Sequence, residues 1–157
     1  MKTLFAALAG ATLLIATSAI AATPDNVVKA QLDSKGVKYE IDKDGDFKIL
    51  YKLDGGRTQI CWVRSTVNTF GSLKIREIWS PGYKSDSNEF PLLIANSLLD
   101  KNHEVKLGAW EAQDDMAMFV VKIPADANAD QLVDAIVAAV DSADEVEKEI
   151  TGAKDEY

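Results

Sequence analysis

Cysteine and histidine are almost absent from this 157-residue sequence, which contains one of each. With Cys61 as its only cysteine, the chain cannot form an intramolecular disulfide. With His103 as its only histidine, it cannot build a multi-histidine zinc site, and Leu107 stands where H-E-x-x-H needs its second histidine. We therefore expect no metal or other cofactor. Because Cys61 lies in an apolar run, we expect it to be a buried strand residue.

Recognisable catalytic motifs are also lacking. A Ser-His-Asp site would have to use His103, and the sequence has no G-x-S-x-G motif. The segment Asp42–Asp46 resembles the start of a calcium loop, but Leu53 stands where an EF-hand has its glutamate. Asp114 and Asp115 are typical of a hairpin turn. We expect a protein that is not an enzyme; a hydrolase that uses His103 or an aspartate pair is the alternative.

The first 21 residues have the pattern of a secretory signal peptide. Lys2 supplies the positive end, Leu4–Ile15 is apolar, and Ala19-Ile20-Ala21 matches an A-x-A cleavage site. The apolar run is too short for a membrane anchor, which needs about 20 residues. We expect cleavage after Ala21, a periplasmic or secreted location, and a single domain over residues 22–157 without a membrane span.

Acidic residues outnumber basic ones, 25 against 17, which gives a formal net charge of −8. Nucleic acid is therefore a poor partner. Most of the excess lies in Asp126–Tyr157, which the periodicity assigns largely to a helix. A solvated helix face that maintains solubility is the simpler interpretation. The second is a docking face for a basic protein or peptide, presented by Asp130, Asp134 and Asp141.

Helix start and stop signals predict three helices. Thr23-Pro24-Asp25 is typical of a helix start, with the helix ending at Gly36. Ser87 is expected to cap a second helix that runs to about Lys101. Asn128, with Gln131 three residues on, predicts a capping box for a long third helix.

Alternating apolar and polar residues predict about five strands, and a sixth extended segment precedes the second helix. The strands expected are Val37–Ile41, Phe47–Leu53, Thr58–Val67, Val105–Ala112 and Met116–Ile123, and the extra segment is Leu73–Trp79, ended by Pro81-Gly82. The order α-β-β-β-(β)-α-β-β-α, with short connections, predicts an α+β fold with an antiparallel or mixed sheet.

Two of the expected strands are apolar on both faces. These strands are Ile60–Val63 and Met116–Ile123. Whichever set of alternate residues faces the helices, large apolar side chains remain on the opposite face. Helices that flank both faces would explain this pattern. The alternative, which we favour, is a homodimer that packs sheet to sheet or edge to edge.

Aromatic side chains give a second group of candidates for a binding surface. Trp79, Tyr83 and Trp110 could line a groove for a peptide or a small molecule, and Trp62 lies on one of the two-sided strands. Core packing is the alternative for the tryptophans.

A family resemblance covers most of the chain after residue 21. Val27–Trp62 contains Gly36-Val37, Tyr39-Glu40-Ile41-Asp42 and Asp44-Gly45-Asp46-Phe47, followed by a further strand. On these motifs the chain resembles the YbjN-type family, called bacterial sensory transduction regulators. The resemblance extends through residues 88–101 and the Trp110–Ile123 hairpin to the last helix.

The resemblance implies a fold like that of type III secretion chaperones, with helices packed on a mixed or antiparallel sheet and a tendency to dimerise. It brings no catalytic residues. We therefore expect a non-enzymatic, exported binding module of chaperone-like or regulatory type. A small-ligand carrier that uses the aromatic groove is the alternative, followed by a hydrolase.

Overall fold

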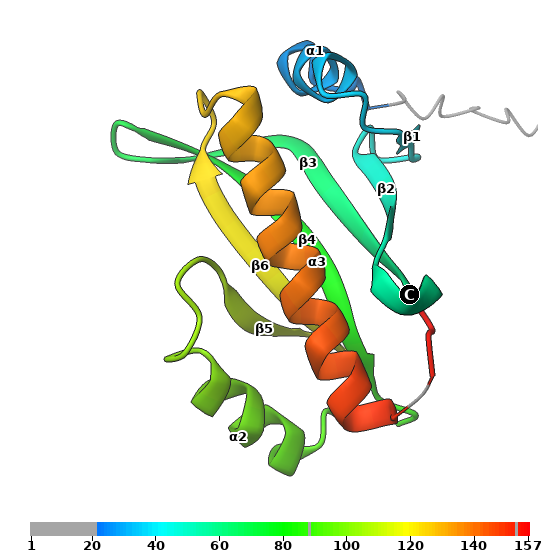
Figure 1. Cartoon of the computed structure of the whole chain (residues 1–157). Coiled ribbons are helices and arrows are strands. Elements are labelled where there is room, and N and C mark those ends of the chain that lie inside the picture. Colours follow the sequence, from blue (N-terminus) through cyan, green and yellow to red (C-terminus); the bar gives the residue numbers. More distant parts are fainter. Residues whose placement is uncertain (1–21, 88, 153) are drawn as a thin grey trace, which may run out of the picture.

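A computed structural model describes residues 22–87, 89–152 and 154–157, in which three helices accompany one six-stranded sheet (Figure 1). The helices are α1 (Asn26–Ser34), α2 (Leu92–Lys101) and α3 (Ala129–Thr151). The strands are β1 (Glu40–Ile41), β2 (Phe47–Lys52), β3 (Thr58–Phe70), β4 (Leu73–Lys84), β5 (Ala109–Gln113) and β6 (Met116–Pro124).

The strands lie in the order β1-β2-β3-β4-β6-β5, and every neighbouring pair is antiparallel. The predicted α+β class is confirmed, with six strands in place of about five. The expected signal peptide lies outside the described residues. Within those residues, no helix combines the length and the apolar character needed to cross a membrane.

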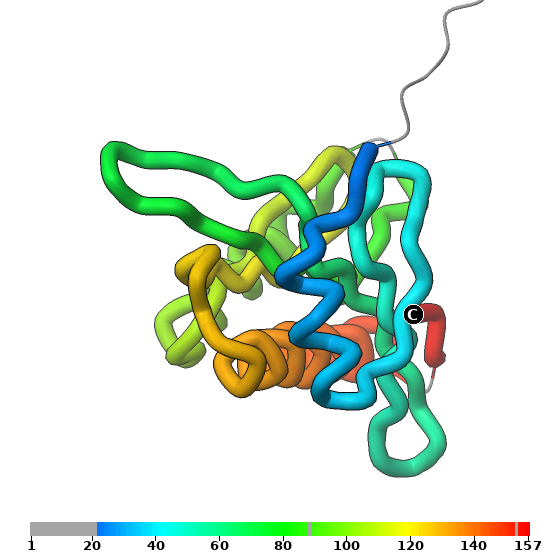
Figure 2. Tube along the Cα trace, turned by 90° about the horizontal axis from the view of Figure 1, so that it is seen from above, coloured from blue at the N-terminus to red at the C-terminus, as the bar shows by residue number. Residues whose placement is uncertain are grey.

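All three helices lie on one face of the sheet, which we call the helical face. Helix α3 runs across it against β3, β4 and β6, and α1 packs on α3 (Figures 1 and 2). Leu98 of α2 belongs to the same core as Trp110 of β5. The stripe of α3 that is buried in this core consists of Leu132, Ala135, Ile136, Ala139, Val140, Ala143 and Val146.

The helix starts agree with the prediction for α3 and differ for the other two. Asn128 and Gln131 form the predicted capping box. Helix α1 is capped by Asp25, whose carboxylate accepts from two backbone N–H groups, and not by Thr23. Helix α2 begins only after Pro91, because the Ser87 hydroxyl donates to Glu89 O at 2.8 Å and holds a turn there.

Strand β4 continues through Pro81-Gly82, where we had expected it to end. The register between β4 and β6 shifts between Pro81 and Tyr83, and this β-bulge accommodates the proline that cannot donate to the ladder. Gly82 is required for a second reason. A Cβ atom at this position would lie 2.4 Å from Cη2 of Trp110, so only glycine lets the indole ring pack here.

A buried ion cluster fastens the end of α3 to the connection between β2 and β3. The Arg57 guanidinium contacts Asp144 at 2.6 Å and Glu147 at 3.0 Å, and these two carboxylates are 6% and 0% exposed. Burial raises the pKa of Glu147 above its ordinary value. Burial would also raise the pKa of Asp144, but hydrogen bonds from Lys148 and Arg57 hold it below the usual range. The helix end therefore depends on Arg57.

Replacing Arg57 with alanine tests this dependence. The Arg57→Ala change leaves the buried Glu147 carboxylate without its cation and Asp144 with Lys148 alone, and we expect the free energy of unfolding to fall by about 3 kcal/mol. Urea unfolding followed by circular dichroism measures the loss. Lys29→Ala, which breaks only the exposed pair with Asp33, is the control and should leave the midpoint unchanged. An Arg57→Ala protein as stable as the control would contradict the role of the cluster.

Cys61 is fully buried on the helical face, as predicted. Burial raises the pKa of its thiol to about 12, so almost no thiolate is present at pH 8. A thiol-specific reagent such as Ellman's reagent should therefore not modify the native protein at pH 8, and modification should begin only as denaturant unfolds the chain. Modification of the native protein at the rate of a free cysteine would contradict this placement.

Candidate functional site

The face of the sheet opposite the helices carries a continuous set of large apolar side chains, and we call it the open face. Trp62 on β3 lies directly opposite Trp79 on β4, and Trp79 lies opposite Val120 on β6. Leu50 on β2 pairs with Ile60 and is 58% exposed. No helix in the described part of the chain covers this face (Figures 1 and 2). The interpretation that helices flank both faces of the sheet is therefore wrong.

Two acidic turns border a single groove on the open face. The turn between β1 and β2 contributes Asp42 and Asp44, and the turn between β5 and β6 contributes Asp114 and Asp115. These turns belong to opposite sides of the sheet, and the twist of the sheet accounts for their approach. The groove has a volume of about 380 Å³. Its remaining lining residues are Trp62, Arg64, Trp79, Gln113, Met116 and Met118.

Local backbone chemistry fixes both turns of this acidic groove. The Asp42 carboxylate accepts from the backbone N–H groups of Asp44 at 2.9 Å and Asp46 at 3.0 Å. Asp114 has a φ of 54°, a left-handed conformation that aspartate tolerates better than most residues. The acidic side chains are thus turn residues whose positions are set by the backbone.

Arg64 is the one cation among the residues that line the acidic groove. Its guanidinium lies 4.3 Å from the centre of the Trp79 ring and 3.0 Å from the Asp46 carboxylate. The Trp79 indole N–H donates to Glu77 at 3.0 Å, which fixes the ring. Four carboxylates and one guanidinium line the groove, so the groove is negative, and the Trp79 ring already supports a cation.

A second hollow of the open face is basic. Its volume is about 530 Å³, and Leu50 and Ile60 form its apolar floor. Three lysines and one acidic residue, Glu40, line it, and we call Lys38, Lys48 and Lys52 the lysine patch. None of the three takes part in an ion pair with another described residue. The open face therefore carries a basic hollow along β1 and β2 in addition to the acidic groove.

The structure separates the aromatic residues that we had expected to share one groove. Trp62 and Trp79 meet on the open face. Trp110 is only 7% exposed and packs edge-on against Phe119 on the helical face, with ring centres 5.2 Å apart. Tyr83 also packs against the core. The groove of Trp79, Tyr83 and Trp110 is therefore not formed, and core packing holds for one tryptophan of three.

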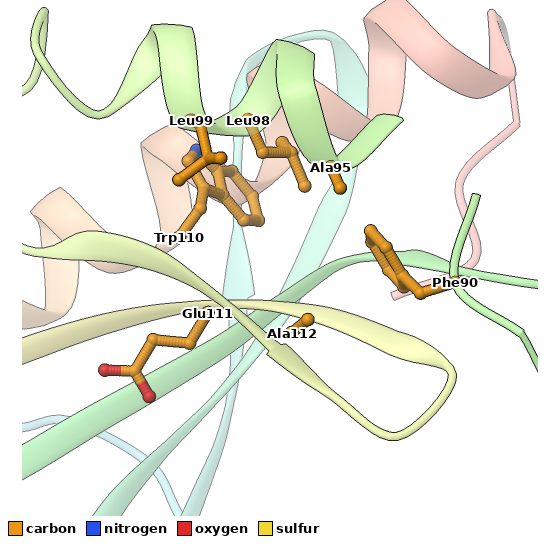
Figure 3. A pocket seen from close by; sticks show the side chains of 7 residues that line it. All are labelled: Phe90, Ala95, Leu98, Leu99, Trp110, Glu111 and Ala112. Atoms are coloured by element: carbon orange, nitrogen blue, oxygen red, sulfur yellow. The ribbon is translucent and has the colours of Figure 1, made fainter. Parts of the chain in front are cut away.

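A smaller apolar cleft lies between α2 and β5 (Figure 3). Leu98 and Leu99 approach Trp110 from the helix, whereas the Glu111 carboxylate points away from them. Its volume of about 180 Å³ is less than half that of the acidic groove. The cleft also offers almost no polar group. The acidic groove is therefore the better candidate for a recognition site.

The remaining candidates lie apart from the acidic groove. Asp130, Asp134 and Asp141 are exposed on α3, and Asp130 forms an ion pair with Lys35. His103 is exposed in the turn after α2 and lines neither hollow of the open face. Sequence reasoning assigned Asp114 and Asp115 to a turn and missed their place at the groove, because that place depends on the twist of the whole sheet.

No protein-family model and no curated protein matches the chain. The resemblance to the YbjN-type family and to type III secretion chaperones stays a prediction. Function must therefore be argued from the geometry and charge of the open face.

Fluorescence quenching can test the charge of the acidic groove. Trp62 and Trp79 are partly exposed beside four carboxylates, so in a Trp110→Phe protein the cation Cs⁺ should quench emission more strongly than the anion I⁻. Neutralising the rim by Asp114→Asn with Asp115→Asn should reduce this difference. A preference for I⁻, or no change on neutralisation, would contradict a negative groove.

Proposed function

We propose that the protein is an exported, non-enzymatic binding module whose open face docks a basic, partly apolar segment of a partner protein. The observation that carries the proposal is the uncovered pair Trp62 and Trp79 between two acidic turns. Exposed apolar patches with polar rims are typical of interaction sites. The N-terminal sequence pattern and the family resemblance support export and a binding role.

The chemistry of the acidic groove selects the partner. Tryptophan is enriched among residues that dominate binding energy, and the ring faces attract cations as well as apolar groups. The carboxylates at both ends favour lysine and arginine and repel acidic segments. A segment in which basic side chains alternate with aliphatic ones satisfies both the floor and the ends of the groove.

A small organic cation is the second candidate ligand, because the volume of about 380 Å³ falls within the range of small-molecule sites. The stacked Arg64 guanidinium indicates which chemistry the Trp79 ring accepts. Such a ligand would use the ring and one acidic end, whereas a protein segment would use both ends.

Titration with designed peptides tests the proposal. A twelve-residue peptide that alternates lysine or arginine with leucine or valine should quench or shift the emission of the Trp110→Phe protein. An acidic peptide of the same length and apolar content should not. We expect Asp114→Asn with Asp115→Asn to weaken binding about tenfold, which corresponds to about 1.4 kcal/mol. Guanidinium and tetramethylammonium ions, titrated alone, report on the small-cation candidate.

The matched control removes two charges from the other acidic surface. Asp134→Asn with Asp141→Asn changes the net charge by the same amount on α3, and binding should stay unchanged. Equal weakening in both variants would mean that net charge, and not the acidic groove, attracts the peptide. Failure of the basic peptide to bind the unmodified protein would contradict the proposed function.

A further inference from the structure

We propose that the outer edge of β2 is a second docking site, which takes an extended acidic segment of a partner protein as an added antiparallel strand. This site differs from the acidic groove in its residues and in the sign of its charge. It combines unpaired backbone groups on β2, the lysine patch beside them, and the apolar pair Leu50 and Ile60.

Strand β2 is covered along only one end of its outer edge. Strand β3 pairs with all six residues of β2, whereas β1 pairs only with Phe47 and Lys48. Figure 1 shows β1 beside that one end of β2. The remaining residues of β2, from Ile49 to Lys52, therefore form an open sheet edge, which is a template for pairing with another strand.

The backbone groups on this edge point away from β3. Asp42 N donates to Asp46 O at 3.0 Å, so the backbone groups of Asp46 point toward β1. Backbone direction alternates along an antiparallel strand, and β2 pairs with β3 without a shift, so the groups of Leu50 and Lys52 point to the same side as those of Asp46. Among the described residues, none forms a hydrogen bond with these two N–H and two C=O groups. An added strand can pair with all four.

The side chains of the edge select the sequence of the added strand. Lys48, Leu50 and Lys52 alternate with buried or half-buried neighbours and project from the open face. Lysines on an edge disfavour an uncharged strand, but carboxylates beside them make favourable cross-strand pairs. Glu40 is the only carboxylate among the lining residues of the basic hollow. The edge therefore favours a segment with an apolar residue beside Leu50 and acidic residues two positions away on either side.

An added strand would lie apart from the acidic groove. Its backbone would be two strand spacings, about 10 Å, from β3, which carries Trp62. Along β2, Leu50 lies four residues beyond Asp46, which is about 13 Å and exceeds the Debye length of about 8 Å at 0.15 M salt. The acidic turn at Asp42 and Asp44 therefore repels the segment only weakly. Tryptophan emission reports the acidic groove and not this edge.

Fluorescence anisotropy of a labelled peptide tests the site. A fluorescein-labelled peptide with the sequence Thr-Glu-Thr-Val-Thr-Glu-Thr places valine beside Leu50 and a glutamate beside Lys52. It should bind the unmodified protein, and Lys48→Gln with Lys52→Gln should weaken binding about tenfold. Lys74→Gln with Lys106→Gln removes the same charge outside both hollows of the open face and should leave binding unchanged. Circular dichroism confirms that each variant folds.

Methylation of single peptide nitrogens separates strand addition from charge attraction. In the antiparallel register, the valine N–H of the peptide donates to Leu50 O, whereas the N–H groups of the two neighbouring threonines point away from β2. N-methylation of the valine should abolish binding. N-methylation of one neighbouring threonine, which leaves the charge of the peptide the same, should have little effect.

Amide hydrogen exchange locates the bound peptide. The peptide should slow exchange of the Leu50 and Lys52 N–H groups and leave Ile49, which pairs with Cys61 on β3, unchanged. Decanoate, an anion with an apolar chain and no peptide backbone, should not displace the peptide.

Four results would each overturn the inference: no binding of the acidic peptide, equal effects of the two methylations, unchanged exchange at Leu50, or displacement by decanoate. Asp114→Asn with Asp115→Asn should leave binding of the acidic peptide unchanged. The acidic and the basic peptide therefore test the two docking sites separately, and either site can fail without the other.

Discussion

Helix α3 packs along one face of the sheet against β3, β4 and β6, and the arrangement of the other helices depends on this contact. The small side chains of Ala135, Ala139 and Ala143 form part of the buried stripe and let the helix approach the strands closely. Helix α1 packs on α3, and α2 adds Leu98 to the same core. Because strand residues alternate between faces, a core on one side only leaves Trp62 on the other side in contact with solvent.

Buried charges hold both ends of the described chain on this arrangement. Arg76 on β4 is only 3% exposed. Its guanidinium donates to the Asp25 carboxylate at 2.6 Å and to the Arg64 carbonyl oxygen at 2.6 Å. These bonds tie the start of α1 to β3. Arg57 ties the end of α3 and the following tail to the sheet, since it also donates to Lys154 O at 2.8 Å. No lining residue of the acidic groove comes from these terminal segments, so the ends of the described chain leave it open.

Local sequence signals predicted the elements better than their relations in space. The capping box of Asn128 and the alternation in β2 depend on neighbouring residues, and both were read correctly. The passage of β4 through Pro81 was missed, because a bulge overrides the usual meaning of proline. The bulge also resets the alternation, so sequence spacing could not place Tyr83 and Trp79 on opposite faces. The acidic groove depends on the twist of six strands and has no local signal.

The net charge of −8 attracts a basic segment at long range, but the local arrangement of charge decides where such a segment binds. At 0.15 M salt the Debye length is about 8 Å, so charges on the helical face are largely screened from a segment on the open face. Lysines and carboxylates that meet within an interface are about 4 Å apart and partly removed from water, where each pair is stronger. The four carboxylates of the acidic groove therefore contribute more than the total charge to the attraction of the proposed basic segment.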